Sequence, residues 1–207
     1  MAYRSSVALT RWLGDRRAAI DTVAIAHAAT GEVDGPGRPL EIGRPLAHAY
    51  ILRVVAEFQA FARDLHDLAA EKSVEMAGVT TGYQALLVTA ATEGRSIDRS
   101  NADLRSLTND FRRLGLTGLK GKLATRDRFW ETTASRRGDA ARYADLIQLR
   151  NCLAHGNQTQ LDLLRHAGVT DTVTWCRNRL PGLDRTARAL DRVVWEHLKA
   201  TFSREPW

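Results

Sequence analysis

Between residues 46 and 76, apolar side chains return every three or four positions, a spacing that places them on one face of an α-helix. This is the strongest helix signal in the chain. Elsewhere Ala, Leu and Arg are abundant, while Val, Ile and Thr do not alternate over long runs. These patterns predict an all-α fold. The repeating apolar positions are Ile51, Val54, Val55, Phe58, Phe61, Ala62, Leu65, Leu68 and Ala69.

Further helices are expected on both sides of this one, over residues 6–30, 83–92, 101–114, 122–133, 139–155 and 183–198. Residues 161–166 and 172–180 are shorter apolar pieces, which Pro181 and Gly182 should end. Residues 31–45 contain Gly35-Pro36-Gly37 and Pro39, and predict a flexible linker between the first and second helices. No internal repeat divides the chain, so we expect a single domain over residues 1–207.

The composition is that of a globular protein, with 44% hydrophobic and 26% charged residues. No apolar stretch is long enough to span a membrane. Charged residues near the N-terminus, such as Arg11 and Asp15, interrupt any secretory signal. Cys152 and Cys176 are the two cysteines, too few for a disulfide framework. We therefore expect a cytoplasmic protein with no membrane association.

The segment from Leu149 to Asn157 combines a permanent cation, an amide and a proton-transfer group. Arg150 follows Leu146 and Ile147 on the apolar stripe of its helix. A guanidinium there is costly to bury unless it is paired, so Arg150 must face a carboxylate, a second subunit or an anionic ligand. Asn151 and His155 are four residues apart and share a helix face, and Gly156 suits a helix end.

This Arg-Asn-x3-His pattern, with its Ala-His-Gly ending, resembles the signature of the HEPN superfamily of small helical proteins. The resemblance implies a HEPN-like helical bundle acting as a metal-independent endoribonuclease, typically a homodimer whose two motifs build one cleft. Arg150, Asn151 and His155 would be its catalytic residues. It also implies a toxin or defence effector, with RNA as substrate and an antitoxin or other regulatory protein as partner.

The residue chemistry suits RNA cleavage. The 2′-hydroxyl of RNA is an internal nucleophile, so the protein must move protons and neutralise phosphoryl charge. Histidine can serve either proton step, arginine can hold the non-bridging oxygens, and asparagine can orient either group. One histidine supplies one proton-transfer group, and a two-fold dimer would supply two.

Other interpretations of the motif stay open. Arg and His in a last helical turn can simply satisfy terminal carbonyls and the helix dipole. The chain would then be a non-catalytic module that binds nucleic acid or a partner protein. A third alternative is a nucleotide-binding regulator paired with a nucleotidyltransferase antitoxin. Some HEPN toxins carry a modified Tyr two residues after the His, and Asn157 occupies that position here.

Positive charge is concentrated before and within the motif helix. Residues 95–150 hold 13 Lys or Arg and 7 Asp or Glu, an excess equal to the +6 of the whole chain. Cations beside aromatic residues suit phosphates and stacked bases, and a solvated helix face over a core Phe129 and Trp130 is the alternative. The candidate RNA-binding residues are Lys120, Lys122, Arg126 and Arg128.

Glu57 and Asp64, seven residues apart on the long helix, are candidate supporting carboxylates that would orient Arg150 or His155. The alternative is an exposed face with a local Arg53–Glu57 pair. Cys152, His155, His166 and Cys176 could in principle bind zinc, but their spacing fits no familiar zinc pattern. No metal site and no cofactor are therefore predicted.

Overall fold

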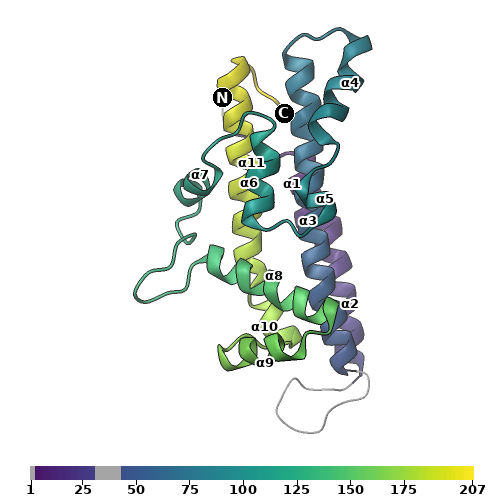
Figure 1. The fold of residues 1–207 in the computed structure, drawn as a ribbon, viewed down its shortest axis with the longest axis vertical. Helices are drawn as coiled ribbons and strands as arrows, with labels where there is room; N and C mark the ends of the chain where they lie inside the picture. Colours follow the sequence, from purple (N-terminus) through teal and green to yellow (C-terminus); the bar gives the residue numbers. More distant parts are fainter. Residues whose placement is uncertain (1–2, 31–42) are drawn as a thin grey trace.

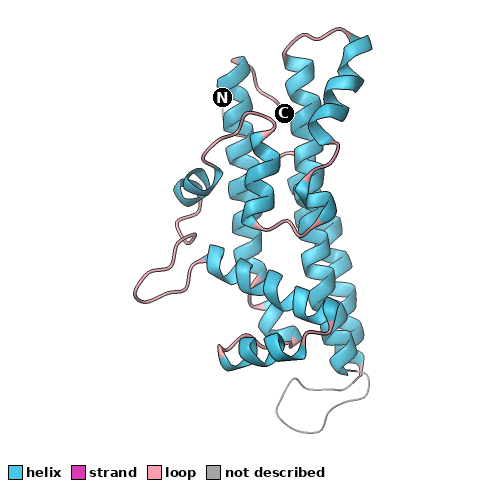
Figure 2. Ribbon diagram, in the orientation of Figure 1, coloured by secondary structure: helices cyan, strands magenta, loops and turns pink. Residues whose placement is uncertain are grey.

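The computed structural model describes residues 3–30 and 43–207, and within these ranges the chain folds into helices without a named strand (Figures 1 and 2). The all-α prediction is therefore confirmed. None of the described helices is long and apolar enough to cross a membrane. The helices are α1 Val7–Arg11, η1 Trp12–Arg16 (a π-helical turn), α2 Arg17–Ala29, α3 Gly43–Met76, α4 Thr81–Thr92, α5 Ser96–Arg99, α6 Leu104–Arg112, α7 Leu119–Arg126, α8 Asp139–His155, α9 Gln158–His166, α10 Val173–Arg177 and α11 Leu180–Phe202.

Two long helices, α3 and α11, form the scaffold and run side by side along the long axis of the molecule (Figure 1). The N-terminal run α1–η1–α2 packs against α3, and α8 crosses the lower part of the bundle in contact with both α3 and α11. α9 and α10 lie below α8, and α7 lies beside α11. α8 is thus packed across both scaffold helices.

Aromatic side chains fill the centre of the bundle. Trp12, Phe58 and Phe61 are fully buried, and the Trp12 and Phe58 rings meet edge to face with centroids 5.4 Å apart. The Tyr143 ring of α8 lies 4.9 Å from Phe58 of α3. Burial of such large rings is a dominant source of stability, so this cluster ties the N-terminal helix, α3 and α8 into one core.

Most helix ends follow the expected signals, and three do not. α3 begins at Gly43, so Pro45 lies in its first turn and not in the linker, where a missing N–H costs little. Pro181 likewise lies in the first turn of α11 and does not end an element. α7 stops at Arg126 and not near residue 133, because the Asp127 carboxylate accepts a hydrogen bond from the Phe129 N–H and forms a turn.

The structure also differs from expectation at one short helix, and the expected linker lies largely outside the described residues. The short helix α5, Ser96–Arg99, was not expected, and it is held by Asp110, whose carboxylate accepts hydrogen bonds from the backbone N–H groups of Ser96 and Ile97. The flexible linker expected over residues 31–45 falls, for residues 31–42, outside the described residues.

The π-helical turn η1 carries an arginine that joins two carboxylates of α3. Arg16 donates to Glu57 at 2.6 Å and to Asp64 at 2.8 Å, and its side chain is 21% exposed. Glu57 also pairs with Arg53 at 2.7 Å, but the Arg53 side chain is 47% exposed. The inner pair therefore links two helices, while the outer one is a local i,i+4 pair.

We predict that Arg16→Ala lowers the free energy of unfolding by roughly 2 kcal/mol, because it leaves Glu57 buried without its interhelical partner. Arg53→Ala is the matched control and should cost less than about 1 kcal/mol, since its partner pair is solvent-screened. Urea denaturation followed by far-UV circular dichroism measures both. Equal losses in the two variants would contradict the assignment of Arg16 as the structural link.

Candidate functional site

The candidate site is the C-terminal end of α8, so its position depends on how that helix is anchored. At the start of α8, the Asp139 N–H donates to the Phe129 carbonyl at 2.8 Å. A Cβ on Gly138 would lie 2.3 Å from the Glu131 carbonyl carbon, so the close approach of these two backbone segments requires glycine. Further along, Tyr143 donates to the Ala102 carbonyl, and Leu146 is fully buried. These contacts fix the rotation of α8.

Arg150 and Asn151 are partly buried and joined to each other. Arg150 Nη1 donates to Asn151 Oδ1 at 3.2 Å, and the same oxygen accepts from Asn101 Nδ2 at 2.7 Å. Asn101, in the loop between α5 and α6, therefore holds the Asn151 amide in place. Among the described residues, Arg150 has no carboxylate partner. Of the three partners expected for its guanidinium, a second subunit and an anionic ligand remain.

His155 is the last residue of α8, and it is exposed. Gly156 adopts the left-handed conformation at φ 63° and caps the helix by donating to the Cys152 carbonyl, which confirms the helix end expected there. The Asn157 side chain then accepts from the Gln160 N–H and begins α9. The imidazole thus stands at an abrupt helix–helix junction, open to solvent.

The expectation that Glu57 or Asp64 orients the motif is corrected by their contacts with Arg16. Both carboxylates accept hydrogen bonds from Arg16 of η1, and no contact among the described residues joins either of them to Arg150 or His155. They therefore neutralise Arg16 and leave Arg150 uncompensated. The Arg53–Glu57 pair of the alternative interpretation is present at 2.7 Å, but Glu57 is buried and does not lie on an exposed face.

The four basic residues expected to bind RNA lie at the other end of α8. Lys120 and Lys122 are exposed on α7, and Arg126 pairs with Glu196 of α11 at 2.8 Å. Phe129 is partly exposed and Trp130 is buried. Because α7 leads into the start of α8, the residues near Asp139 and the motif at Arg150 are separated by roughly 17 Å along the helix. These basic residues precede the motif closely in the sequence, but in the fold they do not lie beside it.

Functional candidates that the sequence analysis passed over lie on α11. Arg185, Arg188 and Arg192 line a hollow together with Arg126 and Arg128. Their spacing of three and four residues places them on one helix face, which is a signal that the sequence alone contains.

The other candidate ligands are buried or dispersed. Cys152 and Cys176 are free, buried thiols, and burial raises the pKa of Cys176 to about 12. In residues 3–30 and 43–207, no group of three or more His, Cys, Asp or Glu side chains is placed to hold a metal ion.

A network centred on Asp171 fixes α9 and α10 under the motif. The Asp171 carboxylate accepts from His48 of α3 at 2.9 Å and from Arg165 of α9 at 2.7 and 3.0 Å. Arg44 lies 3.5 Å away. Burial alone would raise the pKa of Asp171, but the hydrogen bonds from His48 and Arg165 outweigh it and hold that pKa well below its ordinary value.

No protein-family model matches the chain, and comparisons with curated proteins and with solved structures found no match either.

The lowered pKa of Asp171 predicts an acid-dependent loss of stability. Its carboxylate binds a proton less readily in the folded than in the unfolded state, so its contribution is full above about pH 4 and declines as the pH falls further. Asp171→Asn should lower the free energy of unfolding at neutral pH, and the difference from wild type should shrink on acidification. Denaturation across this pH range measures it, and a difference independent of pH would contradict the prediction.

Proposed function

We propose that this protein is a metal-independent endoribonuclease of the HEPN type, acting as a toxin or defence effector. The observation that carries the proposal is the guanidinium of Arg150. It is partly buried, hydrogen-bonded to the neutral amide of Asn151 and without a carboxylate partner in the described chain. A partly buried cation without a countercharge favours an anion, and the phosphodiester of RNA is the anion that the motif chemistry suits.

The roles follow from the surroundings of each residue. Arg150 would bind the non-bridging phosphoryl oxygens through its planar fork. Asn151, held by Asn101, would fix the orientation of that guanidinium. His155 is exposed and would exchange a proton either with the 2′-hydroxyl or with the leaving 5′-oxygen. The products would carry 2′,3′-cyclic phosphate and 5′-hydroxyl ends.

A second copy of the chain would complete the site. Ala144, Gln148 and His155 share the exposed side of α8, while Arg150 is partly exposed and lies roughly 140° away from His155 around the helix. Apposing two such faces across a two-fold axis would bring two histidines to one cleft and so supply both proton-transfer groups. The two Arg150 side chains would reach this cleft through their length, and the RNA phosphate would be their anion. We therefore place the dimer interface on α8.

A non-catalytic binding module is the second candidate, and the Asn101–Asn151 hydrogen bond favours it. That bond ties α8 to the α5–α6 loop, so Asn151 has a structural use that requires no catalysis. Asn157 likewise serves as the N-cap of α9, and it stands where some HEPN toxins have a modified tyrosine. The two candidates differ in whether RNA is cut.

We predict that His155→Ala and Arg150→Ala each reduce RNA cleavage at least 100-fold, a magnitude typical of losing a proton-transfer group or a charge clamp. Both residues are at or near the surface, so circular dichroism should show unchanged helical content. Arg105→Ala, which removes an exposed arginine of α6 outside the proposed interface, is the control and should keep full activity. Cleavage of labelled RNA is the measurement.

The same assay separates the enzyme from the binding module. A 2′-deoxy substitution at the scissile nucleotide should block cleavage and leave binding measurable, because it removes the nucleophile. A chelator should leave the rate unchanged. Wild-type cleavage by His155→Ala would refute the assignment, and binding of RNA without cleavage by the wild type would establish the module instead.

The composite site predicts that inactive subunits interfere with active ones. When wild type is mixed with an excess of His155→Ala subunits and allowed to exchange, activity should fall by more than dilution explains, because mixed dimers carry incomplete sites. Addition of an unrelated protein at equal concentration controls for crowding. Sedimentation should show a dimer, and a monomer that still cuts RNA would exclude the shared cleft.

A further inference from the structure

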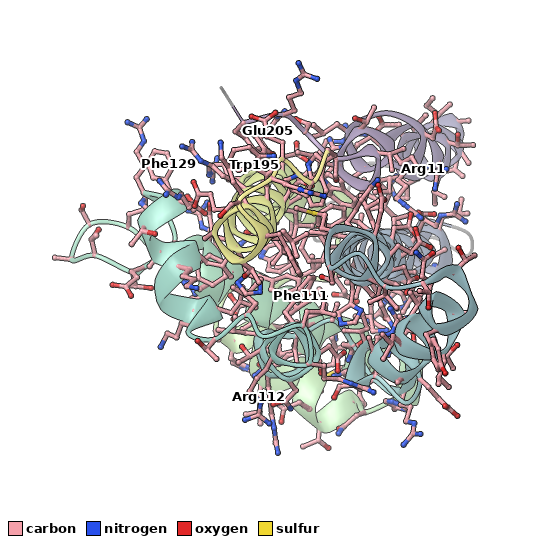
Figure 3. The ribbon with its side chains drawn as sticks, turned by 90° about the horizontal axis from the view of Figure 1, so that it is seen from above. Arg11, Phe111, Arg112, Phe129, Trp195 and Glu205 are labelled. Atoms are coloured by element: carbon pink, nitrogen blue, oxygen red, sulfur yellow. The ribbon has the colours of Figure 1, made fainter. Side chains whose placement is uncertain are left out.

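A hollow of about 570 Å³ lies between the N-terminal segment, the end of α7 and α11. Its size falls within the usual range for small-ligand sites. Five arginines line it, and the one carboxylate among its lining residues is Asp127. Figure 3 shows this side of the bundle, where Phe129 and Trp195 are labelled. The arginines are Arg126, Arg128, Arg185, Arg188 and Arg192.

Three of these cations stand on one face of α11. Arg185, Arg188 and Arg192 follow one another at spacings of three and four residues, so their charges are neighbours. Like charges at these spacings repel one another and destabilise a helix. The fold then adds Arg126 and Arg128 from α7 and the turn after it. Repulsion of this kind is relieved by an anion placed among the cations.

Only part of this charge is neutralised within the described chain. Arg126 and Arg192 share the single carboxylate of Glu196, at 2.8 and 3.0 Å. Neither Arg128 nor Arg188 has a carboxylate partner there, and both are exposed. The open side of the hollow is therefore positive.

The nearby acidic groups face inward. Arg185 donates to Asp139 at 2.7 Å and lies 4.0 Å from Asp127, and both of these side chains are 1% exposed. Burial and the neighbouring Asp139 raise the pKa of Asp127. These carboxylates hold Arg185 in place and present little negative charge to the hollow.

An aromatic ring holds the cations in position. The guanidinium carbons of Arg128, Arg136 and Arg185 lie 4.6, 4.7 and 4.9 Å from the centroid of Phe129. Cation–π contacts of this kind orient guanidinium groups without neutralising them. A ligand would thus meet cations that are already ordered, which reduces the entropy lost on binding.

We propose that this hollow binds the phosphates of a nucleoside phosphate, supplied either by a single-stranded RNA or by a free nucleotide. Planar guanidinium groups match phosphate oxygens in pairs, and several such groups around one hollow suit a phosphate-bearing ligand. The choice of RNA as one source rests on the proposed function, whereas the charge argument does not. The hollow lies at the opposite end of α8 from Arg150, so it would hold RNA away from the site of cleavage.

The test compares two double variants that remove the same charge. Arg128→Gln with Arg188→Gln empties the hollow of its two unpaired cations. Arg105→Gln with Arg112→Gln removes two exposed arginines of α6, and Arg112 projects away from the side that carries Phe129 (Figure 3). Both pairs are introduced into the His155→Ala protein so that RNA stays intact. Fluorescence anisotropy then measures binding of labelled single-stranded RNA and competition by ATP.

The hollow variant should bind RNA at least tenfold more weakly, and the α6 variant within about twofold of its parent. The slope of log affinity against log salt should fall by about 1.4 in the hollow variant, the value for two phosphate contacts on a single strand. If ATP displaces the labelled RNA from the parent protein, and the hollow variant no longer binds ATP, a free nucleotide is a sufficient ligand. If the hollow binds RNA but ATP does not displace it, the ligand is the RNA strand. Single substitution of Arg188 keeps the test valid should the double variant unfold.

Several results would overturn the inference. The first is an equal loss of RNA affinity in both double variants, and the second is a parent protein that binds neither RNA nor ATP. The third is binding of a polyglutamate peptide in place of RNA and ATP, which would identify an acidic protein as the ligand. The two proposals fail separately. If the wild type binds RNA at the hollow but cuts no RNA, only the endoribonuclease proposal is refuted. If His155→Ala abolishes cleavage but the hollow variant binds RNA as tightly as its parent, only the proposal for the hollow is refuted.

Discussion

The packing of Tyr143 against Phe58 is the contact on which the candidate site depends. Because α8 is a rigid helix, one buried ring near its start fixes the direction of every later side chain. With Tyr143 and Leu146 buried, His155 faces solvent, whereas Arg150 lies on the same side of α8 as these two residues and is partly exposed because the helix ends there. The exposure of the motif is thus a consequence of core packing about three turns away.

Charge is distributed unevenly between the helix pairs of this fold. Where α3 meets η1, two carboxylates surround Arg16, and where it meets α9, Asp171 is surrounded by basic groups. These clusters are balanced and hold helices together. At Arg150 and at the α11 arginines the balance fails, because the described part of the chain offers too few carboxylates within reach. Places where a fold leaves cations without partners are where anions bind most readily.

The sequence predicts the helices of this fold better than it predicts which side chains pair between them. The bounds of α8, residues 139–155, follow from local signals, namely the helical spacing of its apolar residues and Gly156 at its end. Pro181 is predicted to end an element but lies in the first turn of α11, because proline breaks a helix interior and is tolerated in a first turn. The Arg16 pairs join residues 41 and 48 positions apart, so no local pattern could assign Glu57 and Asp64 to that arginine.

The two arginine sites differ in a way that separates their roles. Arg150 donates to the Asn151 amide and the exposed His155 ends the same helix, so under the proposed function this end of α8 would supply both a phosphate-binding group and a proton-transfer group. The hollow at the other end contains cations and an aromatic ring, and its buried carboxylates serve Arg185. Binding energy gained away from the reacting bond can position a substrate without performing chemistry on it. If both proposals hold, a strand that contacts both ends of α8 would be bound at one end and cut at the other.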